Sequence, residues 1–399
     1  MVHWRRKSRG RLCRIPGLGK VGRLLPLSLY IHFPWCIRKC PYCDFNSHAV
    51  KEGIPEQLYV DALLADLRSD LNLLSAPREI GSIFMGGGTP SLFSPEALDR
   101  LFGGIRQAVA LTADCEITME ANPGTFESAK FAEFRALGIN RLSIGIQSFS
   151  EQHLRILGRV HSSAEALAAA EIAVNAGFDN FNLDLMFGLP EQSAEQMLAD
   201  VQTAIYLAPA HISYYQLTLE PNTYFHRFPP KLPDGDDIFA TQKGCQRLLA
   251  DHGFQQYEVS AYAQAGRQCR HNKNYWQFGD YLGIGAGAHG KISRRLPNDI
   301  VRTVKPKSPE QYLGRDWAVV HQPIEVGQLP LEFLMNQLRL QAGFELAHFC
   351  AVTGLTEASL QPGLSECLQQ GLLCRQDSHY ACTERGWDLL DLVLEKFIA

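Results

Sequence analysis

The sequence lacks the features that mark membrane-spanning and secreted proteins. No apolar run in its 399 residues is long enough to cross a bilayer, and no stretch combines an apolar centre with a small-residue cleavage site. The eleven cysteines are scattered apart from one tight trio, and a chain of this length buries enough apolar surface to be stable without disulfides. We therefore expect a cytoplasmic protein in a reducing environment.

Acidic residues are absent from the first 25 positions, which carry eight Lys and Arg side chains. We interpret residues 1–25 as a basic, disordered leader, because chain ends are commonly loose unless packing holds them. The alternative is peripheral association with the inner face of a membrane, since each Lys or Arg near anionic lipid gains about 1 kcal/mol.

From Leu27 onward, short apolar runs alternate with longer amphipathic stretches, which predicts βα units around a parallel sheet. The predicted strands are Leu27–Pro34, Ser82–Met85, Glu116–Glu120, Leu142–Gln147, Phe181–Met186 and Ile212–Leu219. The predicted helices are Pro55–Leu74, Pro95–Ala110, Ser128–Leu137, Ser163–Ala176, Ala194–Ala208 and Asp237–His252. Six units are fewer than a closed eight-stranded barrel needs, so residues 26–258 are expected to form a partial (β/α)6 barrel, either open or completed by later segments.

The βα rhythm stops after residue 258. Residues 259–304 form a Gly-rich and aromatic connector that we expect to lie over the barrel mouth. Residues 305–399 predict a small, mainly helical, winged-helix-like domain, with a hairpin made of Leu372–Arg375 and His379–Cys382 before a last helix that begins near Thr383. Because that helix is acidic on its exposed side, we expect no nucleic-acid binding.

A cysteine trio directly after the first predicted strand carries the most specific chemistry. Cys36, Cys40 and Cys43 have C-x3-C-x2-C spacing. Iron–sulfur clusters normally take four cysteine thiolates, so three on one loop leave one iron open to a non-protein ligand. The alternative is structural zinc, with His48 as the fourth ligand.

Together with its flanking motifs, this loop resembles the radical S-adenosylmethionine (SAM) superfamily. The likeness rests on residues 30–36 (YIHFPWC), 86–90 (GGGTP), 120–124 (EANPG), 146–149 (IQSF) and 182–185 (NLDL). It is specific to the branch that holds oxygen-independent coproporphyrinogen III oxidase and the HemW-type haem chaperones. It implies a [4Fe–4S] cluster on the trio and SAM bound at the carboxyl ends of the barrel strands, where barrel sites lie.

Residue by residue, the resemblance implies a set of SAM contacts. These are Tyr30, Gly87, Gly88, Thr89, Glu120, Gln147, Arg159 and Asp184. Bare glycine backbone can approach the methionine end, and Glu120 and Asp184 can bind ribose hydroxyls or the ammonium group. Arg159 can pair with a carboxylate as a bidentate fork, although a structural ion pair in a helical region is the alternative.

Two features separate this chain from the oxidase. The oxidase carries a further cysteine two residues after the third, where this chain has Phe45. Residues 271–276 (HNKNYW) look like the H-N-x-x-Y-W signature of the haem chaperones. Histidine is a common axial ligand of haem iron, so His271 is the predicted haem ligand, with Cys269 and His289 as rival contacts.

We therefore predict a haem chaperone that binds haem and delivers it to apoproteins such as membrane haem proteins. The cluster and SAM would then serve regulation, assembly or dimerisation, and we assign no catalytic residue. The alternatives are oxygen-independent coproporphyrinogen III oxidase, which would decarboxylate its substrate through a radical, and a radical enzyme acting on an unrelated substrate.

Overall fold

The computed structural model describes residues 27–124, 127, 129–314 and 317–398. The chain divides into two compact units, one of them Leu25–Glu325 and the other including Val326–Ala399. The predicted basic leader, residues 1–25, lies outside the described residues. Within the part that is described, no helix is long and apolar enough to cross a membrane.

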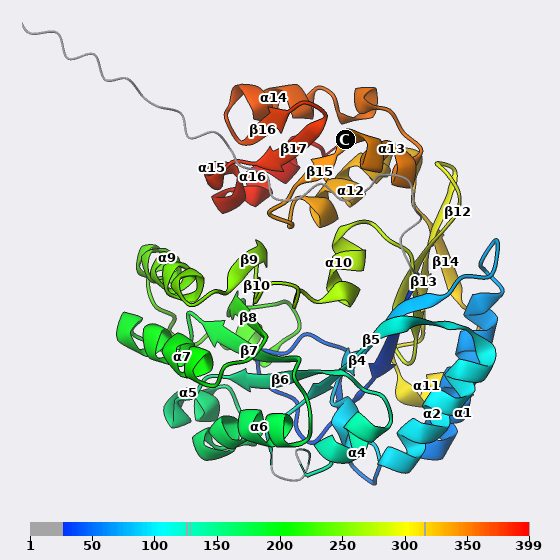
Figure 1. Cartoon of the computed structure of the whole chain (residues 1–399), viewed down its shortest axis with the longest axis vertical. Coiled ribbons are helices and arrows are strands. Elements are labelled where there is room, and N and C mark those ends of the chain that lie inside the picture. The colour runs from blue at the N-terminus through cyan, green and yellow to red at the C-terminus, as the bar shows by residue number, and fades with distance from the viewer. Residues whose placement is uncertain (1–26, 125–126, 128, 315–316, 399) are drawn as a thin grey trace, which may run out of the picture. The chain divides into compact units, whose positions relative to one another are not determined.

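Parallel strands form the centre of the larger unit (Figure 1). They are β1 (Leu27–Phe33), β4 (Ile80–Gly87), β5 (Leu111–Ala121), β6 (Arg141–Gln147), β7 (Phe181–Phe187), β8 (His211–Gln216) and β11 (Tyr281–Ile284). The first six correspond to the predicted strands, which are confirmed to within a few residues, except that β5 begins five residues earlier. The strand β11 pairs in parallel with β1 and was not predicted, because it is short and lies inside the Gly-rich connector.

Helices surround the outer side of this curved sheet (Figure 1). They are α1 (Glu56–Leu71), α2 (Pro95–Ala108), α4 (Phe131–Ala136), α5 (Glu151–Ile156), α6 (Ser163–Asn175), α7 (Ala194–Tyr206) and α9 (Gly235–Asp251). The short helix α8 (Tyr224–Arg227) instead contacts the cysteine loop, where Phe225 N–H donates to Pro41 O at 3.0 Å. Side-chain caps explain several starts. Ser162 and Ser193 form capping boxes with Glu165 and Gln196, each of which satisfies two otherwise unpaired backbone N–H groups.

Antiparallel strands extend the sheet at both edges. Strands β10 (Ala261–Ala263) and β9 (Gln255–Glu258) follow β8, while β12 (His289–Arg295), β13 (Asp299–Val304) and β14 (Val320–Pro323) follow β11. Two short strands, β2 (Trp35–Cys36) and β3 (His48–Ala49), pair separately. The helices α10 (Arg270–Trp276) and α11 (Pro309–Gly314) belong to the same unit. The described strands leave the sheet open, so later segments extend the barrel without closing it.

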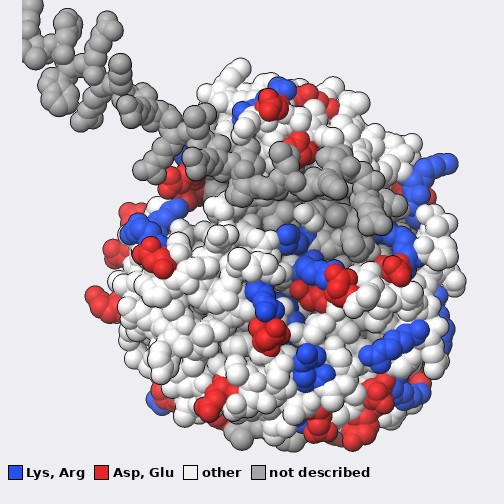
Figure 2. Space-filling model, viewed as in Figure 1, with Lys and Arg blue, Asp and Glu red and all other residues white. Residues whose placement is uncertain are grey.

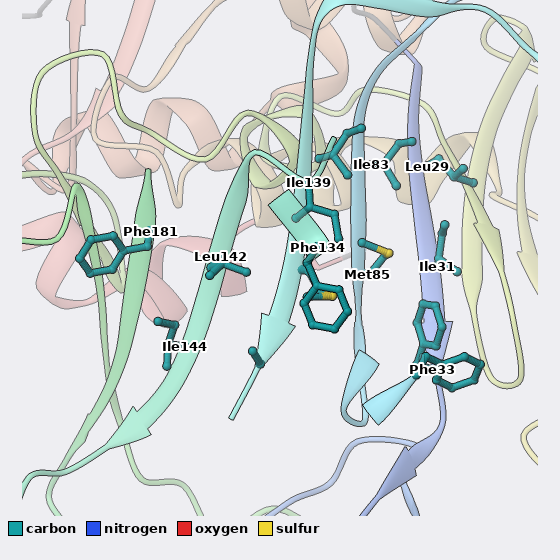
Figure 3. Close-up of a cluster of buried hydrophobic side chains, with 14 of the residues drawn as sticks. Leu29, Ile31, Phe33, Ile83, Met85, Phe134, Ile139, Leu142, Ile144 and Phe181 are labelled. Atoms are coloured by element: carbon teal, nitrogen blue, oxygen red, sulfur yellow. The ribbon is translucent and has the colours of Figure 1, made fainter. Parts of the chain in front are cut away.

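Alternation along the parallel strands determines what lies on each side of the sheet. Leu29, Ile31 and Phe33 of β1 lie in the apolar core beneath the helices, next to Ile83 and Met85 of β4 (Figure 3). The residues between them point to the concave side, because successive side chains of a strand face opposite ways. The concave side is therefore lined by the polar half of each strand.

The C-terminal unit combines short helices with a three-stranded sheet. Its elements are α12 (Leu329–Gln337), β15 (Phe344–Glu345), α13 (Leu346–Thr353), α14 (Gly363–Gln369), β16 (Leu373–Gln376), β17 (His379–Cys382), α15 (Glu384–Asp388) and α16 (Leu390–Glu395). The predicted hairpin is β16–β17, and Thr383 caps the helix that follows it. On the visible face, acidic and basic side chains are interspersed (Figure 2).

A buried ion cluster fixes α1 to the end of β11. Lys305 Nζ lies 2.5 Å from Asp66 Oδ1 and 2.6 Å from Asp70 Oδ1, and all three side chains are at most 1 % exposed. The other oxygen of Asp66 accepts hydrogen bonds from the Tyr312 hydroxyl and the Gly285 N–H. The cluster therefore carries two acids for one base. Neutral donors satisfy the second oxygen of Asp66, whereas Asp70 Oδ2 is buried without a hydrogen-bond partner.

Lys305→Met should lower the free energy of unfolding by about 3–5 kcal/mol, because it leaves two buried carboxylates without their cation. Urea denaturation followed by circular dichroism measures the change. Arg294→Met is the matched control: Arg294 pairs with Asp299 where both side chains are 34 % exposed, and the expected loss is below about 1 kcal/mol. Equal losses in the two variants would contradict the assigned role of Lys305.

Candidate functional site

The cysteine loop leaves the carboxyl end of β1 and lies at the barrel mouth. Each thiol sulfur meets a polar group: Thr89 Oγ1 donates to Cys36 at 3.5 Å, and Ser47 Oγ lies 3.8 Å from Cys43. The Arg159 guanidinium donates to Cys40 at 3.7 Å. Donors aimed at sulfur favour the thiolate, which is the form that binds iron. The structure therefore brings the trio together with two predicted SAM contacts, Thr89 and Arg159.

The glycine loop after β4 (residues 86–90) also touches the segment that leads into the cysteine trio through its backbone. Gly88 N–H donates to Phe33 O and Thr89 N–H to Trp35 O, both at 2.7 Å. A Cβ on Gly88 would lie 2.5 Å from that Phe33 oxygen. Only glycine permits this approach. The predicted approach of this backbone to the methionine end of SAM stays a prediction.

The alternative of a single zinc ion held by the trio and His48 finds no support among the described residues. Among the described residues, no three His, Cys, Asp or Glu side chains gather as ligands of one metal ion, and His48 Nε2 is hydrogen-bonded to Asn46 Oδ1 at 3.3 Å. Burial raises the pKa of the Cys36 and Cys43 thiols. The raised pKa favours the protonated thiols in the metal-free protein. Binding of iron or zinc would release these protons, because both metals take thiolates.

Two partly buried carboxylates, Glu120 and Asp184, lie on the concave side below the glycine loop. Glu120 Oε2 accepts the Gly87 N–H at 3.1 Å, and a Cβ on Gly86 would come within 2.8 Å of the same carboxylate. Burial, followed by the charge of Asp184, raises the pKa of Glu120 to about 8. Such a pair suits a cationic ligand, which would relieve the repulsion between the two acids.

Asp184 lies deeper than predicted, in the middle of β7. Its oxygens accept hydrogen bonds from Asn182 Nδ2 at 2.8 Å and Ser143 Oγ at 3.1 Å. Gln147 does end its strand, where its backbone φ of 70° is unusual for a residue with a side chain. Its Oε1 accepts from the Tyr215 hydroxyl at 2.7 Å, and Tyr30 OH is 3.0 Å from His32 Nδ1.

The alternative role of Arg159, a structural ion pair in a helical region, is not found in the described part of the chain. It follows α5, outside the helix, and its guanidinium donates to Asn122 Oδ1 at 2.6 Å and Gly145 O at 2.8 Å. No described carboxylate pairs with it. Arg159 therefore joins the cysteine loop to β6 and remains available for the carboxylate of a ligand.

Sequence reasoning missed several residues that position this site. Tyr59 donates to His32 O at 2.7 Å and accepts the Ala286 N–H at 2.9 Å. Asn46 donates to Ala286 O at 2.9 Å. These contacts bring the glycine stretch of residues 283–287 against the cysteine loop. The polar residues that alternate in β1 offered a signal for His32, whereas nothing local marks Tyr59 or Asn46.

The prediction that the whole connector covers the mouth is wrong for its HNKNYW part. His271 Nδ1 is 3.0 Å from Ser82 Oγ, and Ser82 lies near the amino end of β4. The first N–H groups of α10 donate to the Glu116 carboxylate, Arg270 at 3.1 Å and His271 at 3.0 Å. A carboxylate that accepts hydrogen bonds from a helix N-terminus stabilises the helix there. Glu116 therefore anchors α10 at the end of the barrel interior opposite the mouth.

His271 is completely buried there and both ring nitrogens are hydrogen-bonded. Nε2 lies 2.6 Å from the Tyr275 hydroxyl, and the ring is 5.2 Å from that of Phe84. Burial, with the positive charge of Arg141, lowers the pKa of His271 to about 3, so its imidazole is neutral at physiological pH.

The two rival haem contacts differ in their surroundings. Cys269 is buried beside His271, and its thiol donates to Glu116 Oε1 at 3.6 Å. Burial raises the pKa of this thiol to about 12. His289 is exposed at the start of β12.

Comparisons with known proteins agree with this arrangement. Residues 30–204 match the radical SAM superfamily and residues 327–389 the HemN C-terminal domain. The protein called heme chaperone HemW from Escherichia coli is 49 % identical over 94 % of this chain and 99 % of its own length. Its namesake from Haemophilus influenzae is 47 % identical over the same shares. The chain belongs to the HemW family of radical SAM proteins.

Membership of the HemW family confirms the family prediction and, with it, the predicted [4Fe–4S] cluster and SAM as cofactors. Coproporphyrinogen III oxidase (HemN) from Escherichia coli has a similar fold, with a TM-score of 0.79 and 22 % identity over 94 % of this chain and 90 % of that chain. This likeness confirms the predicted fold class. The two HemW relatives favour the chaperone prediction over the oxidase alternative.

SAM should bind more tightly as the pH rises from 6.5 to 8.5, by roughly 10- to 30-fold, because the raised pKa of Glu120 leaves its carboxyl mostly protonated at the lower pH. Only the ionised form attracts the cation, so binding below pH 8 releases a proton. Anaerobic calorimetry at several pH values measures both effects.

Glu120→Gln should weaken binding and remove this rise, whereas Glu133→Gln, on the exposed side of α4, should keep it. An unchanged pH profile in Glu120→Gln would show that another group titrates.

Proposed function

We propose that this chain is a haem chaperone that binds haem and passes it to apoproteins. The observation that carries the proposal is the near full-length identity of 49 % to a protein called a heme chaperone. The HNKNYW motif at 271–276 and Phe45 in place of the oxidase cysteine support the same function from within the sequence. A haem chaperone needs apoproteins that accept the haem, so such apoproteins are the proposed partners.

Within this proposal, the barrel mouth holds the cofactors. Cys36, Cys40 and Cys43 would hold the cluster, which supplies an iron corner open to a non-protein ligand. Tyr30, Gly87, Gly88, Thr89, Glu120, Gln147, Arg159 and Asp184 would contact SAM. The two acids offer negative charge to its sulfonium and ammonium, and Arg159 offers a guanidinium to its carboxylate.

His271 would be the haem ligand. A neutral imidazole is the form that binds iron, and the lowered pKa of His271 keeps its ring neutral. Because Nε2 is engaged by Tyr275, binding requires the tyrosine hydroxyl to release that nitrogen. The rings of Phe84 and Tyr275 on either side offer apolar surface for a porphyrin.

The location and assembly of the protein complete the proposal. The cysteines, which are scattered apart from the trio, support a reducing cytoplasm. The basic charges of residues 1–25 support contact with the inner face of a membrane. A homodimer is the assembly that the cluster and SAM would stabilise. Sedimentation of the protein with and without its cluster measures that self-association.

Cys36→Ala should lose most of its iron and sulfide, which anaerobically purified wild-type protein should hold at about four of each per chain. Metal and sulfide analysis measures both. Cys350→Ala, in the C-terminal unit, is the matched control and should keep the cluster. Zinc without sulfide in the wild type would contradict the cluster assignment.

His271→Ala should take up haem at least about tenfold more weakly than the wild type, because it removes the axial ligand. A haem titration followed by the visible absorbance band measures the affinity. His289→Ala is the matched control and should bind haem like the wild type. Weakened haem binding in His289→Ala, with normal binding in His271→Ala, would assign the haem ligand to His289.

Robust anaerobic conversion of coproporphyrinogen III, with reductant and SAM, would overturn the chaperone proposal in favour of the oxidase. We expect no turnover.

A further inference from the structure

Arg141 is a cation in the interior of the barrel. It begins β6 and is only 2 % exposed. Leu142 and Ile144, which share the other face of β6, belong to the apolar core under the helices (Figure 3). Because neighbouring side chains of a strand face opposite ways, Arg141 points to the concave side, where Glu116 and Asp184 lie.

Its guanidinium is not paired. Among the residues that the structure describes, the Arg141 side chain forms no hydrogen bond and no ion pair, and its Nε is buried without any partner. A guanidinium carries five N–H donors, and buried polar groups are almost always satisfied. Unpaired buried donors are costly to the folded protein, so the guanidinium calls for hydrogen-bond acceptors that the chain itself does not supply.

The two carboxylates whose charges act on Arg141 are already engaged in hydrogen bonds. Both oxygens of Glu116 accept hydrogen bonds from the start of α10. Both oxygens of Asp184 accept from Asn182 and Ser143. Each acid therefore acts on Arg141 through its charge and leaves the fork of N–H groups unoccupied.

We propose that Arg141 binds a carboxylate of the ligand in the barrel interior, and that this carboxylate is a propionate of a haem held at His271. The inference rests on the proposed haem-binding function. The strand β5 connects the surroundings of the two residues. Its Glu116 accepts the His271 N–H, and its Thr118 is the register partner of Arg141 on β6. A guanidinium fork matches a carboxylate in two parallel hydrogen bonds. The site would thus recognise haem at both its iron and its acidic edge.

The test compares haem with its dimethyl ester, which has the same iron and ring but no carboxylate. Both are titrated in the same detergent into the cluster-containing protein. The wild type should bind the free acid roughly 10- to 100-fold more tightly than the ester, the range expected for a hydrogen bond to a charged group. Arg141→Gln should bind the ester like the wild type and lose the preference for the acid.

Three further variants or measurements make the test specific. Arg106→Gln removes the same charge from the outer helix α2 and should keep the preference. Arg141→Lys retains the charge without the fork and should keep part of it, and this variant also serves if Arg141→Gln does not fold. SAM affinity, measured without haem, should be unchanged in Arg141→Gln.

The outcomes separate this inference from the proposed function. A wild type that binds no haem overturns both. A wild type that binds haem and ester equally, or an Arg141→Gln that loses affinity equally for both, overturns the Arg141 assignment alone. A loss of SAM affinity with haem binding intact would assign Arg141 to the SAM carboxylate and overturn the haem contact.

Discussion

The alternation of side chains along the parallel strands is the constraint on which the rest of the structure depends. Each strand must present apolar residues to the helices outside, as Leu29 and Ile31 of β1 do. The residues between them are then forced into the barrel, whether or not the chain can pair them. Tyr30, Glu120 and Arg141 are inside for this reason. A fold that keeps its core on the outer face of the sheet thus obtains a polar interior that ligands can use.

The sequence predicts this arrangement well wherever the signal is local. Periodicity places the six strands and their helices within a few residues in most cases, and capping residues such as Ser162 mark the helix starts. The order of the motifs also predicts that the cysteine loop and the glycine loop meet, because both follow neighbouring parallel strands. The strand β11 escapes prediction because its four residues gain their conformation from pairing with β1, about 250 positions earlier.

Non-local contacts explain the errors at the candidate site. The position of α10 depends on Glu116, which lies 154 positions before Arg270. The sequence of the connector alone therefore could not predict that HNKNYW lies at the end of the barrel opposite the mouth. Arg159 was expected in a helix because the residues before it are helical. In the structure its partners are the amide of Asn122 and a backbone oxygen, and only the folded chain brings those acceptors to it.

Glu116 links the stability of the barrel to its use. Its carboxylate could have neutralised Arg141, which lies on the neighbouring strand and the same side of the sheet. The N–H groups of α10 compete for the same two oxygens, and they hold the helix that carries His271 inside the barrel. Anchoring the histidine therefore leaves Glu116 to act on Arg141 through its charge alone. The interior keeps a guanidinium with unpaired N–H donors beside a neutral imidazole, a costly arrangement that the proposed anionic ligand would relieve by reaching both groups.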